Sequence, residues 1–285
     1  RAGKKYYPRD FTMTDQYAVF GNPIAHSKSP LIHMEFANQT QQDLSYEKEL
    51  VALDCFSDCA DAFFNGGGKG LNITVPFKLE AYEYAQQLSQ RARQAGAVNT
   101  LAKQDNGQVI GDNTDGIGML SDIVNNLSWP VSGTRILVLG AGGAVRGVLG
   151  PLLEKSPAEI IIANRTEQTA VQLATAFGAG GNVKGVGFAA IEGQFDLVIN
   201  GTSASLAGDL PPLNASIVGA NTACYDMLYA PQDTVFMQWA RENGCSKVAD
   251  GLGMLVEQAA YAFEVWRGIK PPTKSVITAI RENTL

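Results

Sequence analysis

The chain has 285 residues, of which 45% are hydrophobic and 18% are charged, so it is long enough for about two globular domains and too apolar for a disordered protein. Its net charge of −6 at pH 7 argues against a general affinity for nucleic acid or for anionic membranes, but leaves room for a local basic pocket. No apolar run reaches the roughly 18 residues that a membrane-spanning helix requires.

The first residues contain no apolar segment of the kind that marks a secretory signal. Met13 resembles a natural start, so we expect residues 1–12 to be a tag remnant or a disordered extension. There are only two histidines, and the cysteine spacing is loose for a zinc site. We therefore expect no metal site, and reduced thiols in a cytoplasmic protein; the cysteines are Cys55, Cys59, Cys224 and Cys245.

Short strands and helices alternate through residues 17–114. Alternating hydrophobicity and Gly/Pro boundaries predict strands at 17–23, 45–53 and 71–78. Helical periodicity predicts helices over 29–40, 55–68 and 79–96. Ser29 can cap the first of these helices, and Asn106-Gly107 indicates the turn of a hairpin within 97–116.

From residue 115 to residue 250 the pattern becomes strand–helix–strand. Apolar runs predict strands at 134–140, 158–166, 195–203 and 222–229. This alternation is typical of a parallel, doubly wound sheet. A further helix is predicted over 253–268, where Gln258 falls beside an apolar stripe and needs polar partners that a bound ligand could supply.

A glycine-rich loop, GAGGAVRG, follows the strand at 134–140 and opens a helix. Glycines let the backbone turn tightly beside a pyrophosphate, and the helix N-terminus offers free N–H groups and a positive dipole end. Gly140 and Gly142 match the dinucleotide-binding fingerprint, whereas Val145 occupies its third glycine position. The strand–helix context favours a dinucleotide site over a tight turn without a ligand.

The end of the next strand indicates which nucleotide binds. An NAD site usually places Asp or Glu there, to bind the ribose 2′-hydroxyl. This chain has Asn164, Arg165 and Thr166 instead, and a guanidinium with a hydroxyl suits a 2′-phosphate. We predict NADP rather than NAD, although Glu167 is close by; the alternative is a solvated arginine at a helix start.

Several short polar stretches lie at predicted turns and strand ends. Each one alone has an ordinary explanation as a helix cap, a turn or a solvated lysine. Together with Gln258 they describe a pocket of hydroxyls, amides, one cation and one carboxylate that suits a small polyhydroxylated acid. The stretches are 27–29, 72–74, Lys78, 98–100 and 112–116.

Motifs in a fixed order make a family resemblance specific: YAVFGNPIAHSKSPLIH, GLNITVPFK, AGAVNTL, GDNTDG, GAGGAVRG, NRT, YDMLY and ADGLGMLVEQAA. The chain resembles the shikimate dehydrogenases of the biosynthetic, NADP-dependent type. The resemblance implies an α/β fold of two domains, an α/β substrate domain and a Rossmann-like, doubly wound parallel-sheet NADP domain. It implies a substrate-binding and catalytic domain over 13–114, an NADP domain over 115–250, and C-terminal helices over 251–285 that return to the substrate domain.

The resemblance also implies residue roles. Lys78 and Asp115 match the catalytic pair. The residues expected to face the substrate are Ser27, Ser29, Asn72, Thr74, Asn99, Tyr229 and Gln258. Those expected to bind NADP are Gly140, Ala141, Gly142, Gly143, Ala144, Asn164, Arg165, Thr166, Met227 and Gly251. The chain departs from many relatives at Thr169, where they carry a second basic residue, and from some at Gln90, where they carry a carboxylate.

The implied reaction is the reversible, NADPH-dependent reduction of 3-dehydroshikimate to shikimate, in the biosynthesis of chorismate and the aromatic amino acids. Lys78 would stabilise the negative charge on the carbonyl oxygen and donate a proton, and Asp115 would orient it. Two alternatives stay open: a quinate/shikimate dehydrogenase that prefers NAD, and a catalytically silent NADP-binding sensor on the same scaffold. We expect a monomer or homodimer that binds neither nucleic acid nor membranes.

Overall fold

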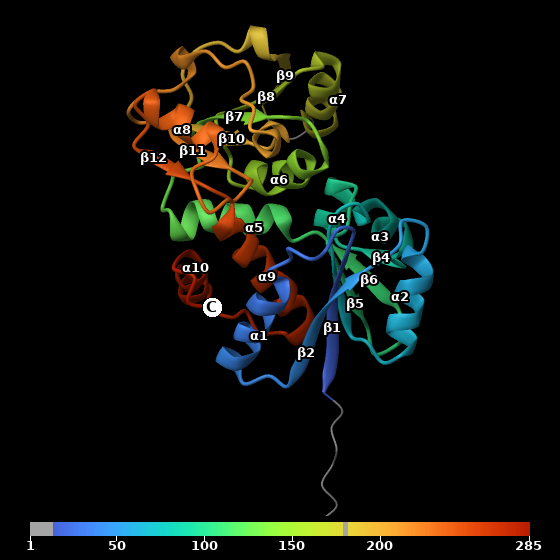
Figure 1. Cartoon of the computed structure of the whole chain (residues 1–285). Helices are drawn as coiled ribbons and strands as arrows, with labels where there is room; N and C mark the ends of the chain where they lie inside the picture. Colours follow the sequence, from blue (N-terminus) through green and yellow to red (C-terminus); the bar gives the residue numbers. More distant parts are fainter. Residues whose placement is uncertain (1–13, 179–181) are drawn as a thin grey trace, which may run out of the picture.

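Two six-stranded sheets, one in each half of the molecule, form the framework of the structure (Figure 1). This computed structural model describes residues 14–178 and 182–285. The tag remnant or disordered extension expected at residues 1–12 lies outside this part of the chain. Within the described ranges, no helix combines the length and the apolar character needed to cross a membrane.

The first sheet is mixed and lies in the lower half of Figure 1. Its strand order is β2-β1-β3-β5-β6-β4; β1 pairs in parallel with β2 and β3, and β5 is antiparallel to β3 and β6. β5 and β6 form the predicted hairpin around Asn106-Gly107. The strands are β1 (Asp15–Gly21), β2 (Leu44–Leu50), β3 (Gly70–Ile73), β4 (Gln87–Leu88), β5 (Thr100–Lys103) and β6 (Val109–Asp112).

Four helices of this half are α1 (Ser29–Thr40), α2 (Phe56–Asn65), α3 (Lys78–Tyr84) and α4 (Gln90–Ala95). The prediction that Ser29 caps α1 is wrong, because Lys28 occupies the N-cap position and no side chain caps the helix. Ser29 is instead the first helical residue, so its hydroxyl is not committed to the helix end.

The segment predicted as one helix over 79–96 is divided into three elements. α3 ends at Tyr84, because the backbone of Ala85 is extended, and the residues that follow form β4, which pairs with β6. Ser89 then caps α4 with its hydroxyl oxygen. Lys78 therefore begins a helix and does not end a strand, since β3 already stops at Ile73.

The second sheet is parallel throughout and lies in the upper half of Figure 1. Its order is β12-β11-β10-β7-β8-β9. The chain begins the sheet with β7 in the middle, adds β8 and β9 on one side of it, and then adds β10, β11 and β12 on the other side. This doubly wound, Rossmann-like order confirms the predicted α/β fold class. The strands are β7 (Arg135–Leu139), β8 (Glu159–Asn164), β9 (Val183–Gly187), β10 (Leu197–Asn200), β11 (Ala223–Asp226) and β12 (Lys247–Ala249).

Helices pack on both faces of this sheet, which explains why its central strand is a continuous apolar run. Ile136, Leu137, Val138 and Leu139 have no exposed surface. The helices are α6 (Gly143–Glu154), α7 (Glu167–Phe177) and α8 (Val235–Glu242). β9, β12 and α8 were not among the predicted elements; β12 has only three residues and β9 contains two glycines, so neither gives a strong strand pattern.

Two helices carry the chain between the halves. α5 (Asp115–Ser121) continues into a π-helix (Asp122–Asn126) and contacts both α6 and α9. α9 (Leu252–Arg267) packs on the first sheet, where Val256 and Phe263 share a core with Tyr17. α10 (Lys274–Arg281) adds Val276 to the same core. The chain thus leaves the first half before α5 and returns to it with α9.

Glycine allows α5 and α9 to approach closely. A Cβ atom at Gly118 would lie 2.6 Å from the backbone nitrogen of Gln258, and one at Gly253 would overlap the Asp122 carboxylate. Asp115 and Gln258 therefore come to the same place in the fold although they are far apart in the sequence.

Candidate active site

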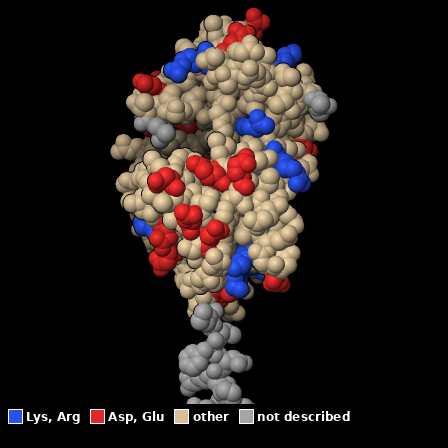
Figure 2. Space-filling view, turned by 90° about the vertical axis from the view of Figure 1, so that its right-hand side faces the viewer, with Lys and Arg blue, Asp and Glu red and all other residues tan. Residues whose placement is uncertain are grey.

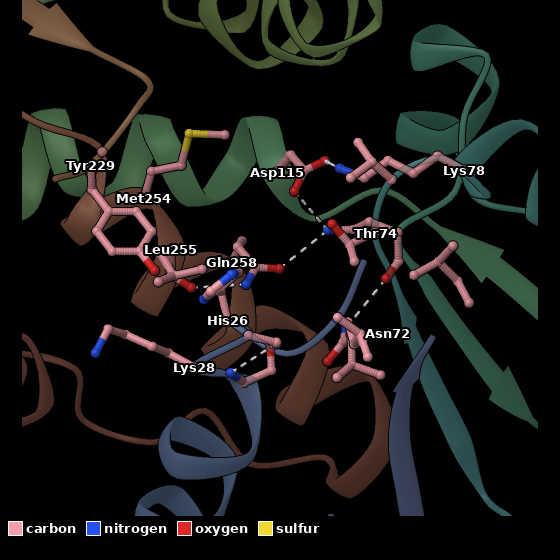
Figure 3. Close-up of a pocket in the computed structure, with 18 of the residues that line it drawn as sticks. His26, Lys28, Asn72, Thr74, Lys78, Asp115, Tyr229, Met254, Leu255 and Gln258 are labelled. Carbon is pink, nitrogen blue, oxygen red and sulfur yellow. Dashed lines mark hydrogen bonds and ion pairs between the residues drawn. The ribbon is translucent and has the colours of Figure 1, made fainter. Parts of the chain in front are cut away.

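A cavity of about 490 Å³ lies where the two halves meet. It is lined by the loop before α1, the end of β3, the starts of α3 and α5, the loop after β11 and the first half of α9 (Figure 3). A volume of this order suits a small ligand. The predicted residues in its lining are Ser27, Ser29, Asn72, Thr74, Lys78, Asn99, Asp115, Met227, Tyr229, Gly251 and Gln258.

An ion pair stands at one side of the cavity. Lys78 Nζ lies 2.6 Å from Asp115 Oδ2, because α3 and α5 begin with these two residues and bring their first turns together. The side chains retain 32% and 16% of their exposure, so a bound molecule can reach the ammonium. Asn99 Nδ2 donates to the other carboxylate oxygen, Asp115 Oδ1, at 2.9 Å. The carboxylate is held from two sides and orients the lysine.

The Asn99 side chain organises the neighbouring polar groups. Its Nδ2 also donates to Gln258 Oε1 at 3.2 Å, and its Oδ1 accepts from the Thr114 N–H at 2.8 Å. Gln258 Nε2 donates to the Leu255 carbonyl at 2.8 Å. Asn99 is 2% exposed, so it acts mainly by fixing the Asp115 and Gln258 side chains around the cavity.

Asn72 is also engaged by the protein. Its Oδ1 accepts from the Tyr46 hydroxyl at 2.7 Å, and its Nδ2 donates to the Asn99 carbonyl and to Thr100 Oγ1, each at 3.3 Å. Burial leaves Asn72 at 6% exposure, and it forms part of the cavity wall beside Thr74. The Asn72 side chain thus has a structural role in the cavity wall.

The cavity lining includes the hydroxyl groups of Ser27, Ser29 and Tyr229, and Figure 3 shows Tyr229 across the cavity from Lys78. The Ser29 N–H donates to Ser27 Oγ at 3.3 Å, which leaves the Ser27 hydroxyl hydrogen available to a ligand. Burial raises the pKa of Tyr229, and the negative charge of Asp250 adds a smaller contribution in the same direction. The Tyr229 hydroxyl is therefore protonated at neutral pH and can donate. Three hydroxyls in this position suit an anionic group.

The predicted nucleotide loops lie outside this lining, at the carboxyl ends of β7 and β8. Gly140 has φ +99°, a conformation that favours glycine, and a Cβ there would lie 3.1 Å from the Gly201 carbonyl oxygen. Cβ atoms at Gly142 and Gly143 would meet nothing within 4 Å, so the N-terminus of α6 faces open space. A phosphate group fits there.

The loop after β8 exposes Arg165 and Thr166. Asn164 Nδ2 donates to the Thr166 carbonyl at 3.0 Å and shapes the turn. The first carboxylate after the strand is Glu167, which already belongs to α7. An exposed guanidinium and a hydroxyl at this strand end fit the 2′-phosphate of NADP.

Comparison with known proteins identifies the family. The model of the shikimate dehydrogenase substrate binding domain matches residues 19–101, that of shikimate/quinate 5-dehydrogenase matches 122–207, and that of the shikimate 5′-dehydrogenase C-terminal domain matches 251–281. The chain is 58% identical to the shikimate dehydrogenase (NADP(+)) of Cellvibrio japonicus, over 94% of this chain and 98% of that protein. The chain belongs to the shikimate dehydrogenase family.

Solved structures agree with this family membership. An Ael1 enzyme from Pseudomonas putida superposes with a TM-score of 0.89 at 47% identity, covering 93% of this chain and 97% of its own. A shikimate 5-dehydrogenase from Thermus thermophilus, solved in complex with NADP(H) and shikimate, has a TM-score of 0.82 at 32% identity, covering 94% and 99%. The predicted resemblance to the shikimate dehydrogenase family is confirmed.

Sequence reasoning did not single out several residues that line the cavity of this shikimate dehydrogenase family member. Among them are His26, Met254 and Leu255, whereas Lys28 lies in the predicted polar stretch 27–29 without a role assigned to it. A signal existed for three of these residues: Lys28 stands between the two predicted serines, and helical spacing places Met254 and Leu255 one turn before Gln258.

Proposed function

We propose that this protein catalyses the reversible, NADPH-dependent reduction of 3-dehydroshikimate to shikimate. The observation that carries the proposal is the Lys78–Asp115 pair, which faces a cluster of hydroxyls across one cavity in a chain of the shikimate dehydrogenase family. The hydroxyl cluster suits an anionic group, and Lys78 on the other side of the cavity suits a proton donor. A ring with a carboxylate at one position and a ketone at another matches this arrangement.

The ketone of the substrate lies beside Lys78. NADPH, when bound, supplies the hydride that reduces the ketone carbon. The Lys78 ammonium, 2.6 Å from Asp115, stabilises the charge that grows on the carbonyl oxygen and gives that oxygen a proton. The lysine regains its proton from solvent. In the oxidative direction the neutral amine takes the proton from the hydroxyl of shikimate.

The remaining cavity residues hold and orient the substrate. Ser27, Ser29 and Tyr229 donate to the carboxylate, and Thr74, Asn99, Asp115 and Gln258 surround the ring hydroxyls. Asn72 keeps the wall in shape through its bonds to Tyr46 and Thr100. Apart from Asp115, which also orients Lys78, these residues make the same contacts in the ground state and the transition state, so they affect KM more than kcat.

The second half binds the cofactor. The backbone of Gly140, Ala141, Gly142, Gly143 and Ala144 receives the pyrophosphate at the N-terminus of α6. Asn164, Arg165 and Thr166 form the 2′-phosphate site, and Met227 and Gly251 flank the nicotinamide, since both also line the substrate cavity. Thr169 offers no second cation, so the preference for NADP over NAD depends on Arg165.

We assign residues 13–114 and 251–285 to the substrate and catalytic domain and residues 115–250 to the NADP domain. The thiols of all four cysteines are free, in keeping with a reducing compartment, and we place the protein in the cytoplasm as a monomer or homodimer.

An absorbance assay tests the function directly. Purified protein is mixed with shikimate or quinate and with NADP or NAD, and formation of reduced cofactor is followed at 340 nm. Fast reduction with shikimate and NADP is expected. Faster reduction with quinate and NAD would instead support the quinate/shikimate dehydrogenase, and binding of NADP without turnover of either acid would support the silent sensor.

A further inference from the structure

Lys28 is a cation in the cavity wall, and its charged side chain has no role in the fold. It lies between Ser27 and Ser29 and is half-buried, and its ammonium makes no hydrogen bond or ion pair with any residue that the structure describes. Figure 3 shows its side chain on the side of Tyr229, across the cavity from Lys78. A lysine needed only for solubility would not have to line a pocket.

The other charges of the lining cancel. Lys78 and Asp115 neutralise each other at 2.6 Å, and His26 is the remaining titratable side chain on the Lys28 side apart from Tyr229, whose hydroxyl is protonated. Lys28 is thus the uncompensated charge among the described lining residues. It also sits at the N-cap of the twelve-residue helix α1, where the helix dipole adds positive potential.

The surroundings of the cavity make a local cation useful. The protein carries a net charge of −6, and Figure 2 shows acidic side chains gathered on the lower half of one face of the molecule. An anionic substrate therefore approaches a protein that repels it at long range. A cation in the cavity wall makes the local potential more positive where the substrate binds.

We infer that Lys28 is a specificity-determining residue, which attracts and holds the carboxylate of the substrate together with the Ser27, Ser29 and Tyr229 hydroxyls. The inference rests on the proposed function, because it requires an acid as substrate. Lys28 does not touch the reacting carbon, so its charge acts on binding and leaves the chemical step unchanged. Lys28 and Lys78 then divide the work: the first selects an acid, and the second protonates the ketone oxygen.

Kinetics of three variants test this. Lys28→Met keeps the length of the side chain and removes the charge, and we expect the KM for shikimate to rise about five- to thirtyfold with kcat within about twofold. Lys28→Arg should restore most of the affinity, and Lys28→Glu should raise KM further. Lys69→Met is the matched control, because Lys69 is exposed and precedes β3 at the end away from the cavity; its KM should equal that of the wild type.

Two further readouts separate charge recognition from a structural role. Raising the ionic strength from about 0.02 M to 0.5 M should lower kcat/KM of the wild type much more than that of Lys28→Met. The methyl ester of shikimate lacks the negative charge, so wild type and Lys28→Met should turn it over with equal KM. The inference would be overturned if Lys28→Met had an unchanged KM for shikimate, or if its KM rose equally for shikimate and for the ester. In either case, wild-type activity with shikimate would still support the proposed function. Absence of wild-type activity with shikimate would refute both.

Discussion

Lys78 is held by one carboxylate and by the first turn of α3, so the backbone can keep its position when the charge is removed. Lys78→Met should lower kcat by about 10²–10⁴, because a general acid acts in the transition state. The KM should change much less, since the hydroxyls across the cavity still bind the substrate. Steady-state kinetics at neutral pH provide the test, and a kcat within about twofold of the wild type would exclude a catalytic lysine.

Arg165 is exposed just after β8, and the first carboxylate beyond it, Glu167, belongs to α7. Arg165→Ala should weaken NADP binding by roughly 1.5–3 kcal/mol, as expected for a lost hydrogen bond to a charged group, and should affect NAD little. Titration of the variant with both cofactors measures the difference. Equal losses for NADP and NAD would show that the guanidinium contacts a part common to both, such as the adenine.

At the level of elements, the crossing of α5 and α9 fixes Asp115 relative to Gln258. A methyl group at Gly118 would press on the backbone of Gln258, which cannot move aside like a flexible side chain. Gly118→Ala should lower the free energy of unfolding by about 1–3 kcal/mol. It should also reduce kcat/KM, by at least the factor that corresponds to this loss of free energy. Gly178→Ala is the control, because a methyl group there meets nothing within 4 Å.

Thermal unfolding and steady-state kinetics of both glycine variants decide this prediction. A Gly118→Ala variant that is less stable but has unaltered kcat/KM would mean that the crossing supports the fold without positioning the site.

Local sequence predicted most of the elements, and it failed where tertiary pairing decided the outcome. Residues 79–96 have good helical composition, yet the middle of the segment pairs with β6, a partner more than twenty residues away. The sequence also contained a signal for the start of α4 inside this segment, since Ser89 is a favourable N-cap residue. The short β12 was missed because three residues carry too little periodic signal.

The candidate site was predictable only in part, for a related reason. Ser27, Lys78 and Gln258 lie in three separate motifs, and nothing in their spacing shows that one cavity unites them. The family resemblance supplied that grouping. Asn72 forms hydrogen bonds with Tyr46 and Thr100, and the charge of Lys28 has no partner in the cavity lining. Both facts depend on side-chain contacts that a sequence pattern does not contain.

For the whole molecule, His33 couples stability to pH. It is 1% exposed and lies in the aromatic core of the first half, stacked on Tyr46. Burial lowers the pKa of His33 to about 3, against about 6.5 in an unfolded chain. Between these values the unfolded chain binds a proton that the folded protein excludes. The stabilisation is complete above pH 6.5 and is lost as the pH falls toward 3.

His33→Phe keeps an aromatic ring in the stack and removes the titration. Between pH 4 and 6 the free energy of unfolding of the wild type should rise with pH more steeply than that of the variant, by about 1.4 kcal/mol per pH unit for one proton. Denaturant titrations at several pH values measure both slopes. His26→Gln, at an exposed histidine, should keep the wild-type slope. Coincident slopes for wild type and His33→Phe would contradict the assignment.

The two passages of the chain between its halves, at the start of α5 and at the start of α9, also limit how those halves can move. Two bodies joined at two points keep one easy degree of freedom, rotation about the line through the joints, whereas sliding or twisting would stretch a connection. Lys78 on one body and the loops after β7 and β8 on the other would therefore approach along a single arc. Such a rotation would change the width of the cavity mouth, and each of the two connections begins a helix that also lines the cavity, through Asp115 on α5 and Gln258 on α9.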